Sequence, residues 1–144
     1  MDDLPHIYRT TARAEAEGLV TLEAPSLPPL ESAAPAEFGG PGDRWSPETL
    51  LTAAVVDCFV LGFRAIARAS KLEWQRLECS VEGKLDRVER TTQFTELALK
   101  AHLQVPAGTD EARAQRILER AEKTCLITNS LSAEVHLETR VEVV

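Results

Sequence analysis

Hydrophobic residues between Ser46 and about Ser70 occupy nearly every side of a helix. The start of this helix is marked by Ser46-Pro47-Glu48, because serine caps free amide groups, proline suits the first turn and a carboxylate complements the helix dipole. A helix that is apolar on nearly all sides is enclosed by protein rather than laid on a surface. We therefore expect it to form the centre of the fold.

Alternation of hydrophobic and polar residues predicts strands before and after this helix in the sequence. Residues 6–24 predict a hairpin that turns at Gly18, residues 74–88 and 93–105 an antiparallel pair, and residues 134–144 a final strand. The expected apolar faces of the pair are Leu77, Cys79, Val81 and Leu85 on one strand, and Leu97, Leu99, Ala101, Leu103 and Val105 on the other.

A second helix is expected from the capping sequence Thr109-Asp110-Glu111 to near Lys123 or Cys125. The resulting order, ββ–α–ββ–α–β, is typical of an α+β two-layer protein, and we expect antiparallel sheets wrapped around the buried central helix in one domain over residues 1–144. One sheet cannot enclose that helix on all sides, so we also expect an intertwined homodimer. The stretch 25–44 predicts a long loop that is either functional or an arm reaching toward a partner.

Composition narrows the classes of function. A net charge of −7 and a pI of about 5.0 argue against a surface for nucleic acid or for anionic membrane lipid. The N-terminus is acidic where a signal peptide is basic, and Asp57 and Arg64 interrupt the longest apolar stretch, which makes it a poor membrane span. The three widely spaced cysteines do not form a secreted disulfide framework, so we expect reduced thiols and a cytoplasmic protein.

The cysteines are the candidate chemical groups. For Cys58, a buried core thiol and a reactive thiol both stay open, because free cysteine is among the most buried residue types. Cys125 follows the second helix, and Cys79 lies on the apolar face of a strand, where a structural role is expected. The histidines, at 6, 102 and 136, are not spaced as metal ligands and the glycine-rich loop is not a phosphate-binding motif, so neither a metal nor a cofactor is expected.

Two separated cysteine motifs resemble those of the OsmC/Ohr family, and the resemblance covers essentially the whole chain. The first motif combines a glycine-rich loop, a Pro-Glu helix start and a Cys-Phe pair, in the segment 38–59. It reads Phe38-Gly39-Gly40-Pro41-Gly42-Asp43-Arg44-Trp45-Ser46-Pro47-Glu48-Thr49-Leu50-Leu51, then Ala53-Ala54 and Asp57-Cys58-Phe59. The second is Ala121-Glu122-Lys123-Thr124-Cys125, followed by Asn129.

This resemblance implies a dithiol peroxidase that reduces organic hydroperoxides and, less well, hydrogen peroxide. It implies Cys58 as the peroxidatic thiol, Cys125 as the resolving thiol and Glu48 as the acidic residue of the site, with an arginine holding the reactive thiolate. Such a guanidinium would counter the desolvation that raises the pKa of a buried thiol. An external dithiol, lipoyl-type in the Ohr branch, would reduce the resulting disulfide.

The sequence departs from the family pattern at two places. The hairpin turn, where Ohr-type members carry the arginine, has none here, so the candidates are Arg44, which we favour, and Arg13. Leu126 stands where many relatives have proline after the cysteine. Both departures bear on substrate and reductant more than on the thiol chemistry.

Glu48 and Cys58 are ten positions apart, which on one straight helix is about 15 Å along the axis. Either the helix breaks between them or Glu48 serves the partner subunit's Cys58, and we favour the second. Two other functions stay open: an OsmC-like dimeric module that binds a small apolar ligand with non-catalytic thiols, and a structural dimer with buried cysteines.

Overall fold

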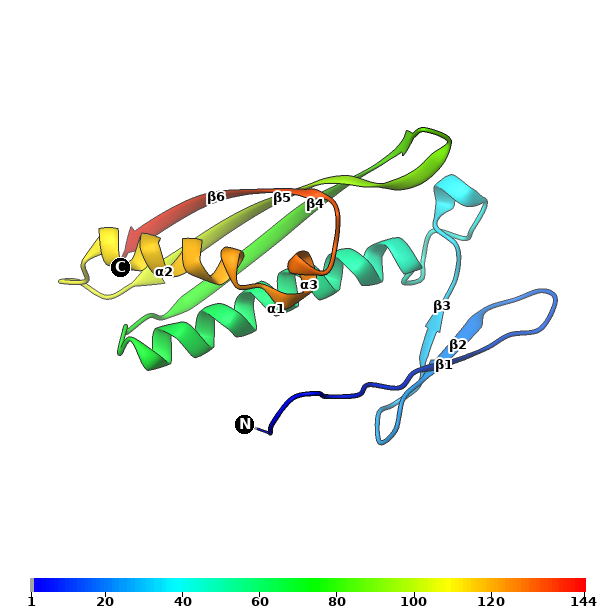
Figure 1. The fold of residues 1–144 in the computed structure, drawn as a ribbon, viewed down its shortest axis with the longest axis horizontal. Coiled ribbons are helices and arrows are strands. Elements are labelled where there is room, and N and C mark those ends of the chain that lie inside the picture. Colours follow the sequence, from blue (N-terminus) through cyan, green and yellow to red (C-terminus); the bar gives the residue numbers. More distant parts are fainter. Residues whose placement is uncertain (1) are drawn as a thin grey trace. The chain divides into compact units, whose positions relative to one another are not determined.

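The computed structural model describes residues 2–144. Contacts along the chain form two units, one up to Leu51 and the other from Thr52 to Val144 (Figure 1). One OsmC-like domain over residues 1–144 stays a prediction.

The N-terminal unit contains a small antiparallel sheet of three strands in the order β1-β2-β3. The predicted hairpin is present, although β1 (Thr11–Arg13) and β2 (Val20–Glu23) are shorter than expected. The region expected to be a loop contains a third strand, β3 (Leu30–Ser32), and a 3-10 turn, η1 (Ala36–Phe38).

The glycine-rich motif after η1 has a steric explanation. A Cβ atom at Gly40 would lie 1.6 Å from the carbonyl oxygen of Ala34, so only glycine fits where this backbone crosses the preceding segment. The Gly40 amide also donates to the Pro35 carbonyl at 3.0 Å, which holds the loop that leads into the first long helix.

The C-terminal unit is built on a second sheet, in the order β4-β5-β6. Strands β4 (Arg76–Val88) and β5 (Thr91–Val105) form the predicted antiparallel pair, joined by a two-residue turn in which Glu89 and Arg90 both have positive φ. Strand β6 (Glu134–Val143) pairs with β5 in the parallel direction, where antiparallel sheets were expected. The reason is the crossover between them, which contains helices and returns the chain to the same end of the sheet.

Helix α1 (Pro47–Ala69) confirms the predicted central helix. Its start is fixed by a reciprocal cap, in which the Thr49 amide donates to Ser46 Oγ at 3.1 Å and the Ser46 amide donates to Thr49 Oγ1 at 2.8 Å. One stripe at i, i+4 spacing is fully buried: Val55, Phe59, Phe63 and Ala67. The opposite side is open within one chain, where Leu61 is 50% exposed.

Helix α2 (Glu111–Lys123) is capped as predicted, with the Asp110 carboxylate accepting from the Arg113 amide at 3.1 Å. A four-residue helix, α3 (Leu126–Asn129), was not predicted. Helices α1 and α2 cover one face of the second sheet (Figure 1), and their buried residues form one core with the inward row of β5. That row is the predicted one: Leu97, Leu99, Ala101, Leu103 and Val105. The α+β two-layer architecture is therefore confirmed.

By length and composition alone, α1 would be long and apolar enough to cross a membrane. The core helix of a soluble protein passes the same test, and the fully buried stripe of α1 packs into the core of this unit. The apolar character of α1 is thus explained in part by contacts within the chain.

Candidate thiol site

Cys58 and Cys125 come from distant parts of the sequence and line the same pocket of the C-terminal unit, about 440 Å³ in volume. Cys58 lies in the middle of α1, and Cys125 is the N-cap residue of α3. Both are free thiols. The pocket walls are largely apolar and consist of Ala54, Asp57, Cys58, Leu61, Gly62, Thr124, Cys125, Leu126 and Ile127.

The junction between α2 and α3 fixes the position of Cys125. Its amide donates to the Glu122 carbonyl at 3.2 Å, which ends α2. Its own carbonyl accepts from the Asn129 amide at 3.0 Å and from the Thr128 hydroxyl at 3.2 Å, which begins α3. The Cys125 side chain is buried and lines the pocket, and the hydrogen bonds of its backbone to both helices hold this residue in place.

Burial raises the pKa of the Cys58 thiol, because desolvation disfavours the thiolate. The backbone amide of Ile127 acts in the opposite direction and lowers this pKa, and the Leu126 amide does so more weakly. Hydrogen bonding to the Cys125 thiol and the charge of that group raise it further. None of these groups in the C-terminal unit is a guanidinium, and the pKa of Cys58 is raised above its ordinary value.

Cys79 differs from this pair. It packs against the core from β4, opposite Ala101 on β5, and burial raises its pKa to about 11. A thiol with so high a pKa is a poor nucleophile near neutral pH. These properties fit the structural role expected from the alternation on β4.

Glu48 lines a different pocket, of about 480 Å³, within the N-terminal unit. Among residues 2–144, its Oε1 atom is buried and has no hydrogen-bond partner. The guanidinium of Arg44 is bound to Asp43, at 3.4 Å from Oδ2, and that of Arg13 pairs with Glu23 on β2. The structure therefore brings neither candidate arginine to Glu48. Helix α1 is continuous from Pro47 to Ala69, which removes the alternative of a break between Glu48 and Cys58.

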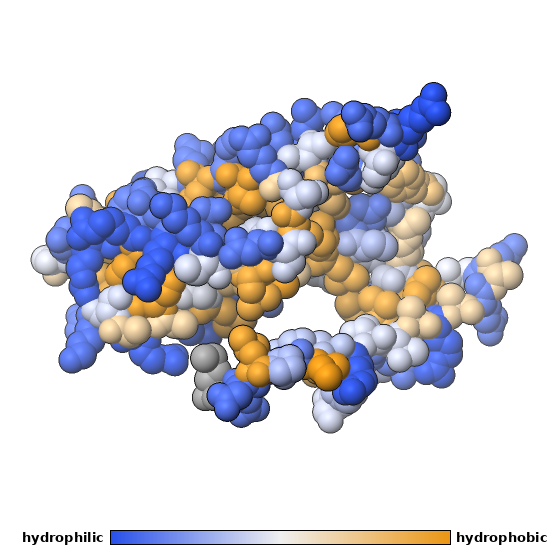
Figure 2. All heavy atoms as spheres, in the orientation of Figure 1, coloured by the Kyte–Doolittle hydropathy of each residue, from blue (hydrophilic) through white to orange (hydrophobic). Residues whose placement is uncertain are grey.

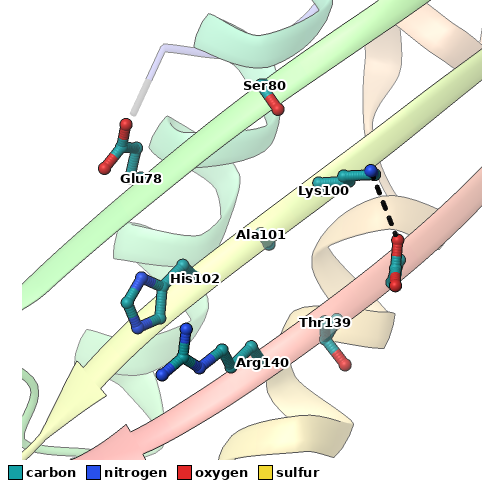
Figure 3. Close-up of a pocket in the computed structure, with 8 residues that line it drawn as sticks. Glu78, Ser80, Lys100, Ala101, His102, Thr139 and Arg140 are labelled. Atoms are coloured by element: carbon teal, nitrogen blue, oxygen red, sulfur yellow. Dashed lines mark ion pairs between the residues drawn. The ribbon is translucent and has the colours of Figure 1, made fainter.

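A polar hollow of about 410 Å³ lies over strands β4, β5 and β6 (Figure 3). Its basic side chains are already paired: Lys100 with Glu138 at 3.9 Å, and His102 and Arg140 with the same Glu142 oxygen at 3.1 and 3.0 Å. These pairs are typical of a solvated sheet face, so we assign no function to this hollow.

Possible metal ligands converge at one point on the same sheet. Oxygen and nitrogen atoms of Glu96, Glu134 and His136 lie within 4.8 Å of one another. The histidine spacing in the sequence gave no sign of this grouping, because the contributing residues meet only through pairing of β5 with β6. Proximity alone does not define a metal site, and the expectation of no metal stays a prediction.

Two free cysteine thiols that line one pocket of an α+β two-layer protein define a candidate thiol-redox protein. The family model for OsmC-like proteins matches residues 40–140, and the chain belongs to this family. Membership supports a peroxiredoxin-like role in hydroperoxide resistance at the level of the family.

Known proteins agree with this assignment. The chain is 25% identical to the uncharacterised protein YmaD of Bacillus subtilis, over 76% of this chain and 75% of that protein. It is 26% identical to the peroxiredoxin OsmC of Escherichia coli, over 67% of both chains. A solved OsmC-like protein of unknown function from Vibrio cholerae has the same fold, with a TM-score of 0.85 and 18% identity over 94% of this chain and 100% of that one.

Proposed function

We propose that this protein is a thiol-dependent peroxidase that reduces organic hydroperoxides and, less well, hydrogen peroxide. One observation supports this most strongly: Cys58 and Cys125, free thiols from distant segments, line the same pocket. The apolar walls of that pocket favour an organic hydroperoxide over the small, strongly hydrated hydrogen peroxide.

The proposed reaction has two steps. The Cys58 thiolate attacks one oxygen of the peroxide O–O bond, the bond breaks, and the other oxygen takes a proton and leaves as the alcohol. Cys58 then carries a sulfenic acid, and the Cys125 thiol displaces its hydroxyl as water to form the Cys58–Cys125 disulfide. The disulfide prevents further oxidation of Cys58. An external dithiol, for which a lipoyl-type dithiol is our candidate, reduces it by exchange in the cytoplasm.

Activation of Cys58 requires a group that favours the thiolate more strongly than those of the C-terminal unit, where the pKa of Cys58 is raised. In our proposal Arg44 supplies the guanidinium, Glu48 holds it, and both serve the partner subunit's Cys58 across a homodimer interface. The buried, unpartnered Oε1 atom of Glu48 supports this, because a buried acceptor without a donor is costly. The ion pair of Arg44 with Asp43 is solvent-exposed and weak, so the guanidinium can exchange partners.

Exposed apolar side chains support the dimer. Leu61 on α1 and Leu126 on α3 are 50% and 67% exposed and line the thiol pocket. Figure 2 shows hydrophobic residues reaching the surface over these helices. Light scattering coupled to size-exclusion chromatography tests the proposal, and a monomer at micromolar concentration would contradict it.

The peroxidase proposal is tested by mixing the reduced protein with one equivalent of cumene hydroperoxide, titrating free thiols and mapping peptides by mass spectrometry. We expect loss of two thiols and a linked Cys58–Cys125 peptide. Cys79→Ser is the matched control and should behave as the wild type, whereas Cys58→Ser should consume no peroxide. Persistence of all three thiols after long exposure would refute the proposal.

A second candidate function is supported by the N-terminal unit. The pocket that contains Glu48 has almost wholly apolar walls, contributed among others by Val20, Leu22 and Phe38. An apolar ligand with one hydrogen-bond donor would fit it and satisfy the Glu48 oxygen. Ligand binding that survives Cys58→Ser, in a protein that does not turn over peroxide, would favour this binding module over the peroxidase.

A further inference from the structure

One carboxylate stands in the otherwise largely apolar wall of the thiol pocket. Among residues 2–144, Asp57 is the one acidic or basic side chain that lines this pocket, and it directly precedes Cys58 in α1. The sequence between Glu48 and Arg64 contains no other acidic or basic residue. Arg64 and Lys123, the nearest basic residues along α1 and α2, do not line the pocket. A charge at this place in the helix therefore requires an explanation.

The helix geometry places Asp57 in the pocket wall and leaves its charge uncompensated. Ala54 precedes it by three residues and Leu61 follows it by four, so the three side chains neighbour one another along the helix, and all of them line the pocket. Asp57 is exposed and forms no ion pair with any residue that the structure describes. Its charge within one chain thus acts on whatever enters the pocket.

The surroundings strengthen this action. An exposed aspartate is negative near neutral pH, and a fixed charge beside apolar walls is felt more strongly than in bulk water. A molecule with a carboxylate of its own is repelled as it approaches the Cys58 sulfur, whereas an uncharged molecule of the same shape is not. The pocket walls favour apolar groups in both molecules, so charge is the property that separates them.

We propose that Asp57 is a specificity-determining residue, which makes the thiol pocket accept uncharged organic hydroperoxides and discriminate against those that carry a carboxylate. Esters of fatty-acid hydroperoxides belong to the first class and the free acids to the second. This inference rests on the proposed function and names the substrate class of the same site.

The test uses two alkylating reagents that differ in charge. Iodoacetamide is neutral and iodoacetate is an anion, and in both reactions the Cys58 thiolate displaces iodide. The ratio of the two rates at one pH is independent of the fraction of thiolate, because both reagents attack the same species. A variant that only shifts the pKa of Cys58, or only disturbs its packing, changes both rates and leaves the ratio as it was. The rates are measured in a Cys79→Ser background, with peptide mapping to separate Cys58 from Cys125.

Asp57→Asn removes the charge and keeps the shape of the side chain. We expect it to raise the rate with iodoacetate, relative to that with iodoacetamide, by about fivefold at low salt, the effect of one unit charge several ångströms away in a partly solvated pocket. Glu82→Gln is the matched control, because it removes an exposed carboxylate from β4, on the side opposite to the residues that pack against the core. It should leave the ratio unchanged. An equal ratio in Asp57→Asn and the parent would overturn the inference.

Salt provides a measurement that needs no substitution in the pocket. Raising the salt concentration from about 20 mM to about 500 mM screens the repulsion, so iodoacetate should gain on iodoacetamide in the parent protein. Asp57→Asn should lose most of this dependence and Glu82→Gln should keep it. A ratio that does not respond to salt in the parent would contradict the proposal even if Asp57→Asn failed to fold.

Peroxide turnover connects the charge to the substrate. The value of kcat/KM is compared for linoleic acid hydroperoxide and its methyl ester, which differ in the charge of one end. We expect the parent to prefer the ester, and Asp57→Asn to reduce that preference by about the factor found with the alkylating reagents. Turnover of both substrates with a preference that Asp57→Asn does not change would refute this inference alone. Absence of turnover with any hydroperoxide, together with the expected alkylation ratios, would refute the proposed function and leave the charge selectivity of the pocket established.

Discussion

The burial of Cys79 predicts how much more slowly this thiol is alkylated than an unperturbed one. Burial against the core raises its pKa to about 11, from 9.0 for the unperturbed thiol, a difference of about two units. At pH 7.5, well below both values, the thiolate fraction of Cys79 is therefore about one hundredfold lower than that of an unperturbed thiol. Since the thiolate is the nucleophile, alkylation should be slowed by a similar factor.

The assay uses the double variant Cys58→Ser/Cys125→Ser, in which Cys79 is the remaining cysteine. Its alkylation rate by iodoacetamide is followed from pH 7 to 12 and compared with that of the same variant in denaturant, where the unperturbed reactivity returns. A midpoint near 9 in the folded protein would show that Cys79 is solvated and that our placement of β4 against the core is wrong.

The pH dependence of stability follows from the same shift. A thiol whose pKa is raised in the folded state favours folding fully below the pKa of the unfolded chain, near 9.0, and this contribution is lost as the pH rises toward 11. Chemical denaturation of the double variant should thus show stability falling between pH 9 and 11. Adding Cys79→Ala to that variant should flatten this region of the profile.

Three further outcomes are expected. Phe63→Ala should destabilise the protein by about 3–5 kcal/mol in denaturant unfolding, because the ring is fully buried and meets Trp74 edge-on, whereas Phe38→Ala, at an exposed phenylalanine, should cost under about 1 kcal/mol. Asp110→Ala should cost about 1 kcal/mol in the same assay, through loss of the α2 cap, and an unchanged midpoint would refute that assignment. Leu61→Arg should convert the proposed dimer to monomer in light scattering, and a retained dimer would place the interface elsewhere.

Long, strongly periodic segments were predictable from the sequence. Helix α1 and the β4–β5 pair are confirmed, because each spans enough residues for its period to outweigh local exceptions. The failures have physical causes. Alternation of side chains is the same in parallel and antiparallel strands, so it could not reveal the direction of β6. Leu85 is 38% exposed because the β4–β5 ladder shifts register between Lys84 and Leu85, which residue identity does not show.

The residues of the candidate site were easier to predict from the sequence than their arrangement in space. The two thiols that the resemblance named do share a pocket, but α3 has four residues and is too short to produce a period, so this helix was not predicted. One local signal for this helix was present in the sequence. Thr128 follows Cys125 by three residues, and its hydroxyl donates to the Cys125 carbonyl, a local bond that threonine often makes in short turns. The arginine could not be assigned, because neither candidate meets Glu48 within the N-terminal unit.

The reactivity of Cys58 depends on the balance of effects that raise and lower the pKa of its thiol. Desolvation comes with the fold itself and raises the pKa of the thiol, which lowers the fraction of the reactive thiolate. The backbone of Ile127 and, more weakly, that of Leu126 acts in the opposite direction, but the net pKa of Cys58 stays raised. A guanidinium supplied across the proposed interface would favour the thiolate, and its charge would have the greatest effect if the second subunit excluded water from the pocket. In this scheme the C-terminal unit by itself disfavours the Cys58 thiolate, and assembly of the proposed dimer would activate it.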